Sequence, residues 1–121
     1  MPDDLPIKRV PGVAEGRSSG SGFGALAFAV ATSEDKSPSV AEQARRSFAK
    51  LDRVLAELGT DKRHLLSATV YLADLNQKPI FDAEWRRWID ADPQRWPQRA
   101  CVGAALAGDA LVEIVVVAAR P

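Results

Sequence analysis

The sequence predicts an α+β fold, in which one mixed β-sheet carries two helices on one face. Three observations lead to this prediction. The 121 residues are enough for a single core, so residues 1–121 are expected to form one domain. Two segments repeat their apolar residues at helical spacing, and the other apolar runs are short and rich in β-branched residues, as strands are. The expected order along the chain is β-β-α-β-α-β-β.

The beginning of the chain is expected to contribute two strands and a loop. Ile7–Val10 has the length of a short edge strand, and the apolar run Phe23–Ala31 is long enough for a buried one. Gly16–Gly24 is rich in glycine and serine, which is typical of a loop. Gly20–Ala25 matches the dinucleotide pattern G-x-G-x-x-A, but no expected strand leads into it and no helix follows, so we exclude a nucleotide site.

Both helices carry boundary signals as well as periodicity. Ser39-x-x-Glu42 fits a capping box at the start of the first helix, and Gly59 is a natural end for it. The second helix is expected to begin at Pro79 and to end before Asp92-Pro93. Their apolar stripes are expected to pack into the core: Val40, Ala44, Phe48, Leu51, Leu55 and Leu58 in the first, and Phe81, Trp85, Trp88 and Ile89 in the second.

Three further segments have the character of strands. Leu65–Leu72 alternates polar and apolar side chains, which indicates one buried face. Arg99–Leu106 and Leu111–Ala119 are separated by the turn at residues 107–109, which has hairpin length, so we expect them to pair antiparallel. The last strand is apolar on both faces through much of its length, whereas a strand facing solvent would alternate. Oligomerisation would cover its outer face.

Composition excludes several classes of function. Sixteen basic and sixteen acidic residues give zero formal net charge, without the cationic excess that nucleic-acid binding needs. The single cysteine and the acidic residues 3–4 favour the cytoplasm over secretion. Asp109 and Glu113 interrupt the last long apolar region, so no membrane span is expected. His64 is the only histidine and has no neighbouring cysteine, so we expect no zinc cluster and place His64 at the surface between a helix and a strand.

Arg99 and Cys101 are the first candidate site residues. They lie two residues apart on an expected strand, so their side chains point to the same side. The planar guanidinium group of an arginine can donate two parallel hydrogen bonds to a carboxylate, which makes Arg99 a candidate for binding an acidic ligand. The alternative is structural, with Arg99 in a surface salt bridge and Cys101 as a small buried side chain.

Glu113 is the second candidate, because it lies among aliphatic residues of a strand, where an unpaired carboxylate is costly to bury. In a functional site it could hold a water molecule or exchange a proton. The alternative is a carboxylate that faces solvent on an edge strand. Spacing alone leaves both interpretations open.

Several segments resemble the RidA/YjgF family of reactive-intermediate deaminases. The C-terminal likeness lies in Pro97–Val102, Leu111–Ile114 and Val117–Ala119. Gln43–Gly59 is similar to the first long helix of the family, and Thr69–Asp74 to the strand after it. The helix that contains Trp85 resembles the short, YoaB-like branch. The resemblance covers residues 17 to 119.

The resemblance implies a chorismate-mutase-like fold that assembles as a homotrimer, with ligand sites in clefts between subunits. It implies a hydrolase that converts small carboxylated imines or enamines, of the 2-iminobutanoate and 2-iminopropanoate type, to 2-oxo acids and ammonia without a cofactor. In such a site Arg99 would bind the substrate carboxylate, the backbone around Cys101 would contact the reactive nitrogen, and Glu113 would position the attacking water.

Two positions depart from typical members of the family. The tyrosine of the N-terminal loop is absent around Arg17-Ser18-Ser19, and the small Ser-Gly step that ends the early strand is Ala29-Val30 here, so we expect the valine side chain to narrow the pocket. The sequence therefore also allows a noncatalytic trimer that binds a small carboxylate through Arg99 as a sensor or regulator. An RNA-cleaving activity ranks behind both, because no basic or aromatic platform for a single strand is present.

Overall fold

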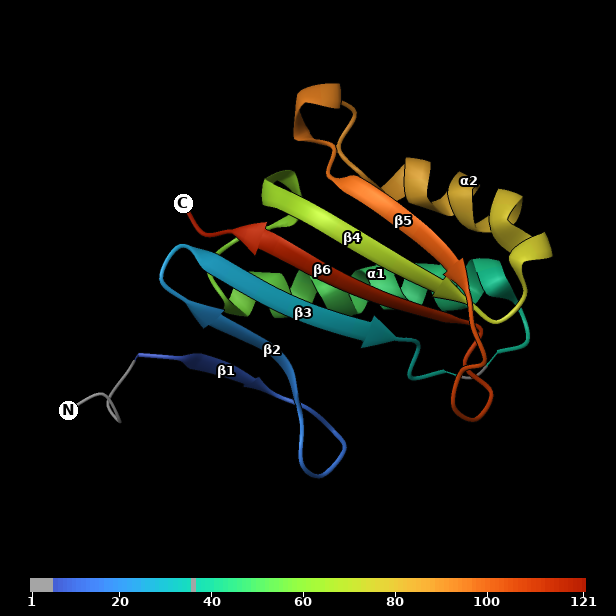
Figure 1. The fold of residues 1–121 in the computed structure, drawn as a ribbon, viewed down its shortest axis with the longest axis horizontal. Coiled ribbons are helices and arrows are strands. Elements are labelled where there is room, and N and C mark those ends of the chain that lie inside the picture. Colours follow the sequence, from blue (N-terminus) through green and yellow to red (C-terminus); the bar gives the residue numbers. More distant parts are fainter. Residues whose placement is uncertain (1–5, 36) are drawn as a thin grey trace.

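The computed structural model describes residues 6–35 and 37–121, which form one six-stranded mixed sheet and two helices (Figure 1). Helices α1 (Val40–Glu57) and α2 (Lys78–Trp88) pack on the same face of the sheet and on each other. The α+β class is confirmed. In spatial order the strands are β1 (Lys8–Pro11), β2 (Ser18–Phe23), β3 (Leu26–Thr32), β6 (Val112–Ala119), β4 (Leu65–Leu72) and β5 (Gln98–Gly103).

The helices form where their boundary signals and apolar stripes predict. The Ser39 hydroxyl accepts a hydrogen bond from the backbone N–H of Glu42 at 3.2 Å, which caps the start of α1. Phe48 on α1 stacks on Trp88 of α2, with ring centroids 4.5 Å apart. The indole N–H of Trp88 donates to Asp52 at 3.0 Å, so its polar atom is satisfied. The expected packing of the apolar stripes into the core is confirmed.

The glycine- and serine-rich segment is a strand, β2, and the prediction of a loop for residues 16–24 was wrong over residues 18–23. The reason is close packing against α1. A Cβ atom at Gly20 would lie 2.6 Å from Val54 Cγ1 and 2.9 Å from the carbonyl oxygen of Phe28, and one at Gly22 would lie 3.3 Å from Leu58. Glycine is therefore present here because two elements approach closely, and the chain order contains an additional strand before β3.

The last two strands do not pair with each other, so the predicted antiparallel hairpin was wrong. β5 pairs in parallel with β4, whereas β6 lies between β3 and β4 and is antiparallel to both. β5 also ends at Gly103, before the predicted Leu106. Because β6 is apolar on both faces, it suits the centre of the sheet, and the segment between the two strands crosses the end of β4, where the Ala104 N–H donates to the carbonyl of Leu72.

The two faces of the sheet differ in cover. Val112, Ile114 and Val116 of β6 point toward the helices and are buried, while Glu113 and Val115 between them point to the opposite face, which we call the open face. Phe28 of β3 and Val102 of β5 leave about 40% of their surface exposed there. Within residues 6–35 and 37–121, no helix has the length and apolar character needed to cross a bilayer. The open face is thus the uncovered apolar surface of the sheet.

Candidate functional site

Arg99 lies on β5 and points to the helix face, where it contacts α2. Its Nη2 atom donates a hydrogen bond to Oδ1 of Asp82 at 2.7 Å, and only 17% of its side chain is exposed. Its guanidinium carbon lies 5.0 Å from the ring centre of Trp85 and 5.7 Å from that of Phe81. Arg99 therefore takes part in a salt bridge, as the structural alternative expected, but a largely buried one with a fixed orientation.

Asp82 connects Arg99 to a second cation and was not singled out from the sequence. Its other oxygen accepts from the Lys78 ammonium group at 2.8 Å, one helical turn away on α2. Burial alone would raise the pKa of Asp82, but hydrogen bonds from Lys78 and Arg99 outweigh burial and hold the pKa below its ordinary value. Asp82 is thus ionised at neutral pH and holds the Arg99 side chain in place.

Cys101 lies on the same side of β5 as Arg99 and packs against the core. Burial raises the pKa of the Cys101 thiol, and the charges of Arg99 and Lys78 offset this effect only in part. The thiol is protonated at neutral pH and is a poor nucleophile. The side chain itself therefore supplies no covalent chemistry.

Glu113 occupies the open face of β6, near the end of the sheet where β3 finishes. Its register partners are Thr32 on β3 and Tyr71 on β4. It lines a cavity of about 610 Å³, which we call the Glu113 cavity, and is partly buried there. The edge-strand alternative is excluded, because β6 is central. The residues that line this cavity with Glu113 include Arg17, Ser18, Ser19, Val30, Thr32, Glu34 and Lys50.

The structure does not bring Arg99 and Glu113 together within one chain. Arg99 pairs in register with Ala68, a buried residue whose side chain points toward the helices. Glu113 points to the open face, on a strand that is separated from β5 by β4. One chain therefore presents two separate groups, a guanidinium group at the sheet edge and a carboxylate on the open face.

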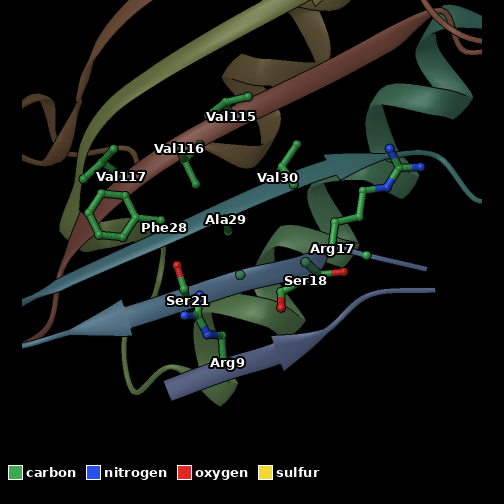
Figure 2. A pocket seen from close by; sticks show the side chains of 13 residues that line it. Arg9, Arg17, Ser18, Ser21, Phe28, Ala29, Val30, Val115, Val116 and Val117 are labelled. Atoms are coloured by element: carbon green, nitrogen blue, oxygen red, sulfur yellow. The ribbon is translucent and has the colours of Figure 1, made fainter. Parts of the chain in front are cut away.

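A second cavity of about 570 Å³ lies on the open face beside the Glu113 cavity, and Figure 2 shows its side chains. Its walls combine apolar side chains such as Phe28, Val30 and Val115 with polar ones such as Arg9 and Ser21. Arg9 lies close to Ser21, whereas Arg17 extends toward the C-terminal end of β3 (Figure 2). Arg17 and Val30 line both cavities, which are therefore adjacent.

The remaining candidates have structural positions. His64 ends a short 3-10 helix (Lys62–His64) directly before β4, with 30% of its side chain exposed and Nδ1 3.2 Å from Oδ1 of Asp61. Trp96 is exposed, and its indole N–H donates to the carbonyl of Asp90, apart from the two tryptophans of α2.

Comparisons with known proteins agree with the fold. The model of the family described as Endoribonuclease L-PSP matches residues 22–120. A RutC family protein of Haemophilus ducreyi is 36% identical over 93 residues, which cover 76% of this chain and 78% of that protein. The RutC family protein YoaB of Escherichia coli is 37% identical over 79 residues, which cover 64% of this chain and 68% of that protein.

Solved structures give the same result over nearly the whole chain. The crystal structure of a YjgF family member from Neisseria meningitidis has a TM-score of 0.88 and 34% sequence identity, and the match covers 97% of each chain. A structure from Pseudomonas aeruginosa has a TM-score of 0.87 and 29% identity, over 95% of this chain and 99% of that one. The chain therefore belongs to the RidA/YjgF family.

Proposed function

We propose that the protein is an imine and enamine deaminase, which hydrolyses small carboxylated substrates to 2-oxo acids and ammonia without a metal or an organic cofactor. The observation that carries the proposal is the setting of Glu113, a carboxylate on the open face that lines a cavity of about 610 Å³. Small-molecule sites have volumes of this order. Membership of the RidA/YjgF family supports the same activity.

The chemistry needs few groups, because the imine carbon is already electrophilic. Glu113 accepts a proton from a water molecule as the oxygen attacks this carbon, and then returns the proton to the nitrogen. Glu113 then moves the hydroxyl proton of the resulting carbinolamine to the nitrogen, so that the C–N bond breaks and ammonia leaves as the C=O bond of the 2-oxo acid forms. The substrate carboxylate takes no part in bond making, so a fixed cation is enough to orient it. Arg99 is proposed for that role.

Arg99 is prepared for the role by its surroundings. Nη2 is held by Asp82, and the guanidinium group lies over Trp85, which fixes its plane before a ligand arrives. The guanidinium has five N–H donors, so donors beyond the one used by Asp82 are available for a carboxylate. The main chain around Cys101, on the same edge strand, is proposed to contact the substrate nitrogen.

A site that uses both residues requires two subunits, since Arg99 and Glu113 lie on opposite faces of one sheet. We propose a homotrimer in which the edge strand β5 of one subunit meets the Glu113 cavity of the next. The same contact would cover apolar side chains of the open face such as Phe28 and Val115. The cytoplasm, which keeps the single cysteine reduced, is the proposed location.

The activity is tested by generating imino acids in place with an amino-acid oxidase and following their hydrolysis to the 2-oxo acid. Wild-type protein is expected to accelerate the hydrolysis. Arg99→Ala is expected to lower kcat/KM about 10- to 100-fold through loss of a charge-assisted contact, and Glu113→Gln about 100-fold or more through loss of the base. Arg63→Ala is the matched control: Arg63 also forms an ion pair with an aspartate, Asp61, but it lies in the short helix before β4 and has no role in the proposed site.

The shared site is tested by co-expressing Arg99→Ala subunits with Glu113→Gln subunits. If each site takes Arg99 from one subunit and Glu113 from its neighbour, about a quarter of the sites in randomly mixed trimers regain both residues, and activity returns. If both residues came from one subunit, every site would keep a defect and no activity would return. The assembly itself is measured by sedimentation, with three times 13.1 kDa expected.

Two other results would replace the proposal. Binding of small carboxylates through Arg99 without turnover of any imino acid would assign a sensor or regulator. Salt-sensitive binding and cleavage of RNA by the pure protein would instead support the activity named in the description of the matching family model.

A further inference from the structure

The Glu113 cavity contains more positive charge than the proposed reaction uses. Arg17 and Lys50 both line it, together with the acids Glu34 and Glu113. Glu34 is already paired, because its carboxylate lies 3.6 Å from Nη2 of Arg53. Within the described residues 6–35 and 37–121, neither Arg17 nor Lys50 has an ion-pair partner. Among the described residues, the cavity thus presents two cations without an ion-pair partner beside the Glu113 carboxylate.

Arg17 is placed where it can reach a ligand held at Glu113. It directly precedes β2, and its side chain extends toward the C-terminal end of β3, as Figure 2 shows. That end of β3 carries Thr32, the register partner of Glu113 on the adjacent strand. Neighbouring strands lie about 5 Å apart. Arg17, just before β2, and Glu113, on β6, therefore border the same cavity from opposite sides of β3.

We propose that Arg17 selects substrates with a second carboxylate, namely the imines of dicarboxylic amino acids, whose hydrolysis yields 2-oxo dicarboxylates and ammonia. This proposal rests on the proposed function: Arg99 of a neighbouring subunit binds the carboxylate next to the imine, and Arg17 binds the distal one. A guanidinium group fits a carboxylate through two parallel hydrogen bonds. An apolar side chain would leave Arg17 unpaired, so the acidic substrate gains an interaction that its apolar analogue lacks.

The proposal is first tested by binding, without turnover. 2-Oxoglutarate and 2-oxopentanoate have the same number of carbons and differ in the terminal carboxylate, so their dissociation constants isolate its effect. Wild-type protein is expected to bind 2-oxoglutarate at least 10-fold more tightly. Arg17→Gln is expected to abolish the difference, and Arg17→Lys to keep part of it. Arg9→Gln is the matched control, because Arg9 lines only the other cavity and should keep the full preference.

The second test uses the imines that oxidases produce from glutamate and from norvaline, which again differ in the terminal carboxylate alone. Wild-type protein is expected to favour the glutamate-derived imine about 10- to 100-fold in kcat/KM, and Arg17→Gln to lose this preference while hydrolysis of the norvaline-derived imine persists. Unfolding of the variant would lower the hydrolysis rates of both imines, so a loss confined to the glutamate-derived imine indicates a change in substrate selection.

The outcomes distinguish the two proposals. Equal affinities for the two oxo acids, or a preference that survives Arg17→Gln, would overturn the role of Arg17 even if imines are hydrolysed. A preference that depends on Arg17, without hydrolysis of any imine, would support the selection of dicarboxylates and would reject the deaminase. Both results together, binding preference and hydrolysis, support both proposals.

Discussion

The substitution Gly20→Ala tests the packing of β2 against α1 most directly. An added Cβ would lie 2.6 Å from Val54 Cγ1 and 2.9 Å from the carbonyl oxygen of Phe28. Carbon atoms in contact normally lie about 3.5–4.0 Å apart, so the strand or the helix must move by about 1 Å. Overpacking of this kind costs about 1–3 kcal/mol. Loss of flexibility in the unfolded chain offsets about 0.4–1 kcal/mol of that cost.

The expected result is a free energy of unfolding lowered by about 1–2 kcal/mol, and a Tm lower by about 4–8 °C. Urea and thermal denaturation measure both, at one protein concentration, because association makes Tm depend on concentration. Gly22→Ala is the matched control on the same strand. Its Cβ would meet chiefly the guanidinium tip of Arg120 at 3.0 Å, which can move, so less than half the effect is expected.

The sign of the result is decisive. If residues 18–23 formed a surface loop, Gly20→Ala would be neutral or would raise stability, because an alanine restricts the unfolded chain more than a glycine does. An unchanged or raised free energy of unfolding for Gly20→Ala would therefore refute the close packing of β2 on α1. Equal losses for Gly20→Ala and Gly22→Ala would refute the specific contact with Val54 and Phe28.

Two further predictions concern buried polar groups. Gln43 is fully buried, donates hydrogen bonds to the carbonyls of Ser37 and Asp109, and accepts one from the N–H of Leu111. Gln43→Leu is therefore expected to lower the free energy of unfolding, measured by urea denaturation, by about 2–4 kcal/mol. A loss below about 1 kcal/mol would contradict this hydrogen-bond network. Asp82 has a lowered pKa, so its stabilising effect is present above about pH 4 and is lost as pH falls through the lowered value. Asp82→Asn is therefore expected to be less stable than wild type by about 1–3 kcal/mol at pH 7, and this difference should shrink on acidification, whereas a constant difference would exclude the ion pairs as its source.

Sequence patterns predicted correctly those helices and strands that form because of interactions between residues close together in the chain. Helix α1 begins at its Ser39 cap and buries its periodic stripe, because capping and periodicity both act within a few residues. β2 could not be predicted in this way. Its glycines indicate a loop when only neighbouring residues are considered, and their actual cause is Val54, more than thirty positions away on α1.

Strand pairing shows the same limit. The turn at residues 107–109 favours a hairpin locally, yet β4 lies between β5 and β6 in the sheet. The sequence did contain a signal for the correct arrangement, since β6 is apolar on both faces, as a central strand is. Edge position and parallel pairing of β5 depend on the crossover through α2, which short-range turn rules do not include.

The same limit applies to the candidate site. Arg99 and Glu113 could be singled out from residue type and strand context, but their partners could not: Asp82 meets Arg99 only because α2 packs beside β5. Arg17 was visible in the sequence only as part of the segment that lacks the tyrosine of typical family members. The family model begins at residue 22, so the match itself does not include Arg17.

The two arginines of the proposed site, Arg99 and Arg17, differ in how firmly their surroundings hold them. Arg99 is held by Asp82 and Trp85 on the helix face of the sheet, which suits a group that every carboxylated substrate must meet. Arg17 is exposed, lies just outside β2 and has no ion-pair partner among the described residues, so it can change without disturbing the core. In the proposed site, the chemistry would depend on the central strand β6 and the substrate range on the loop before β2.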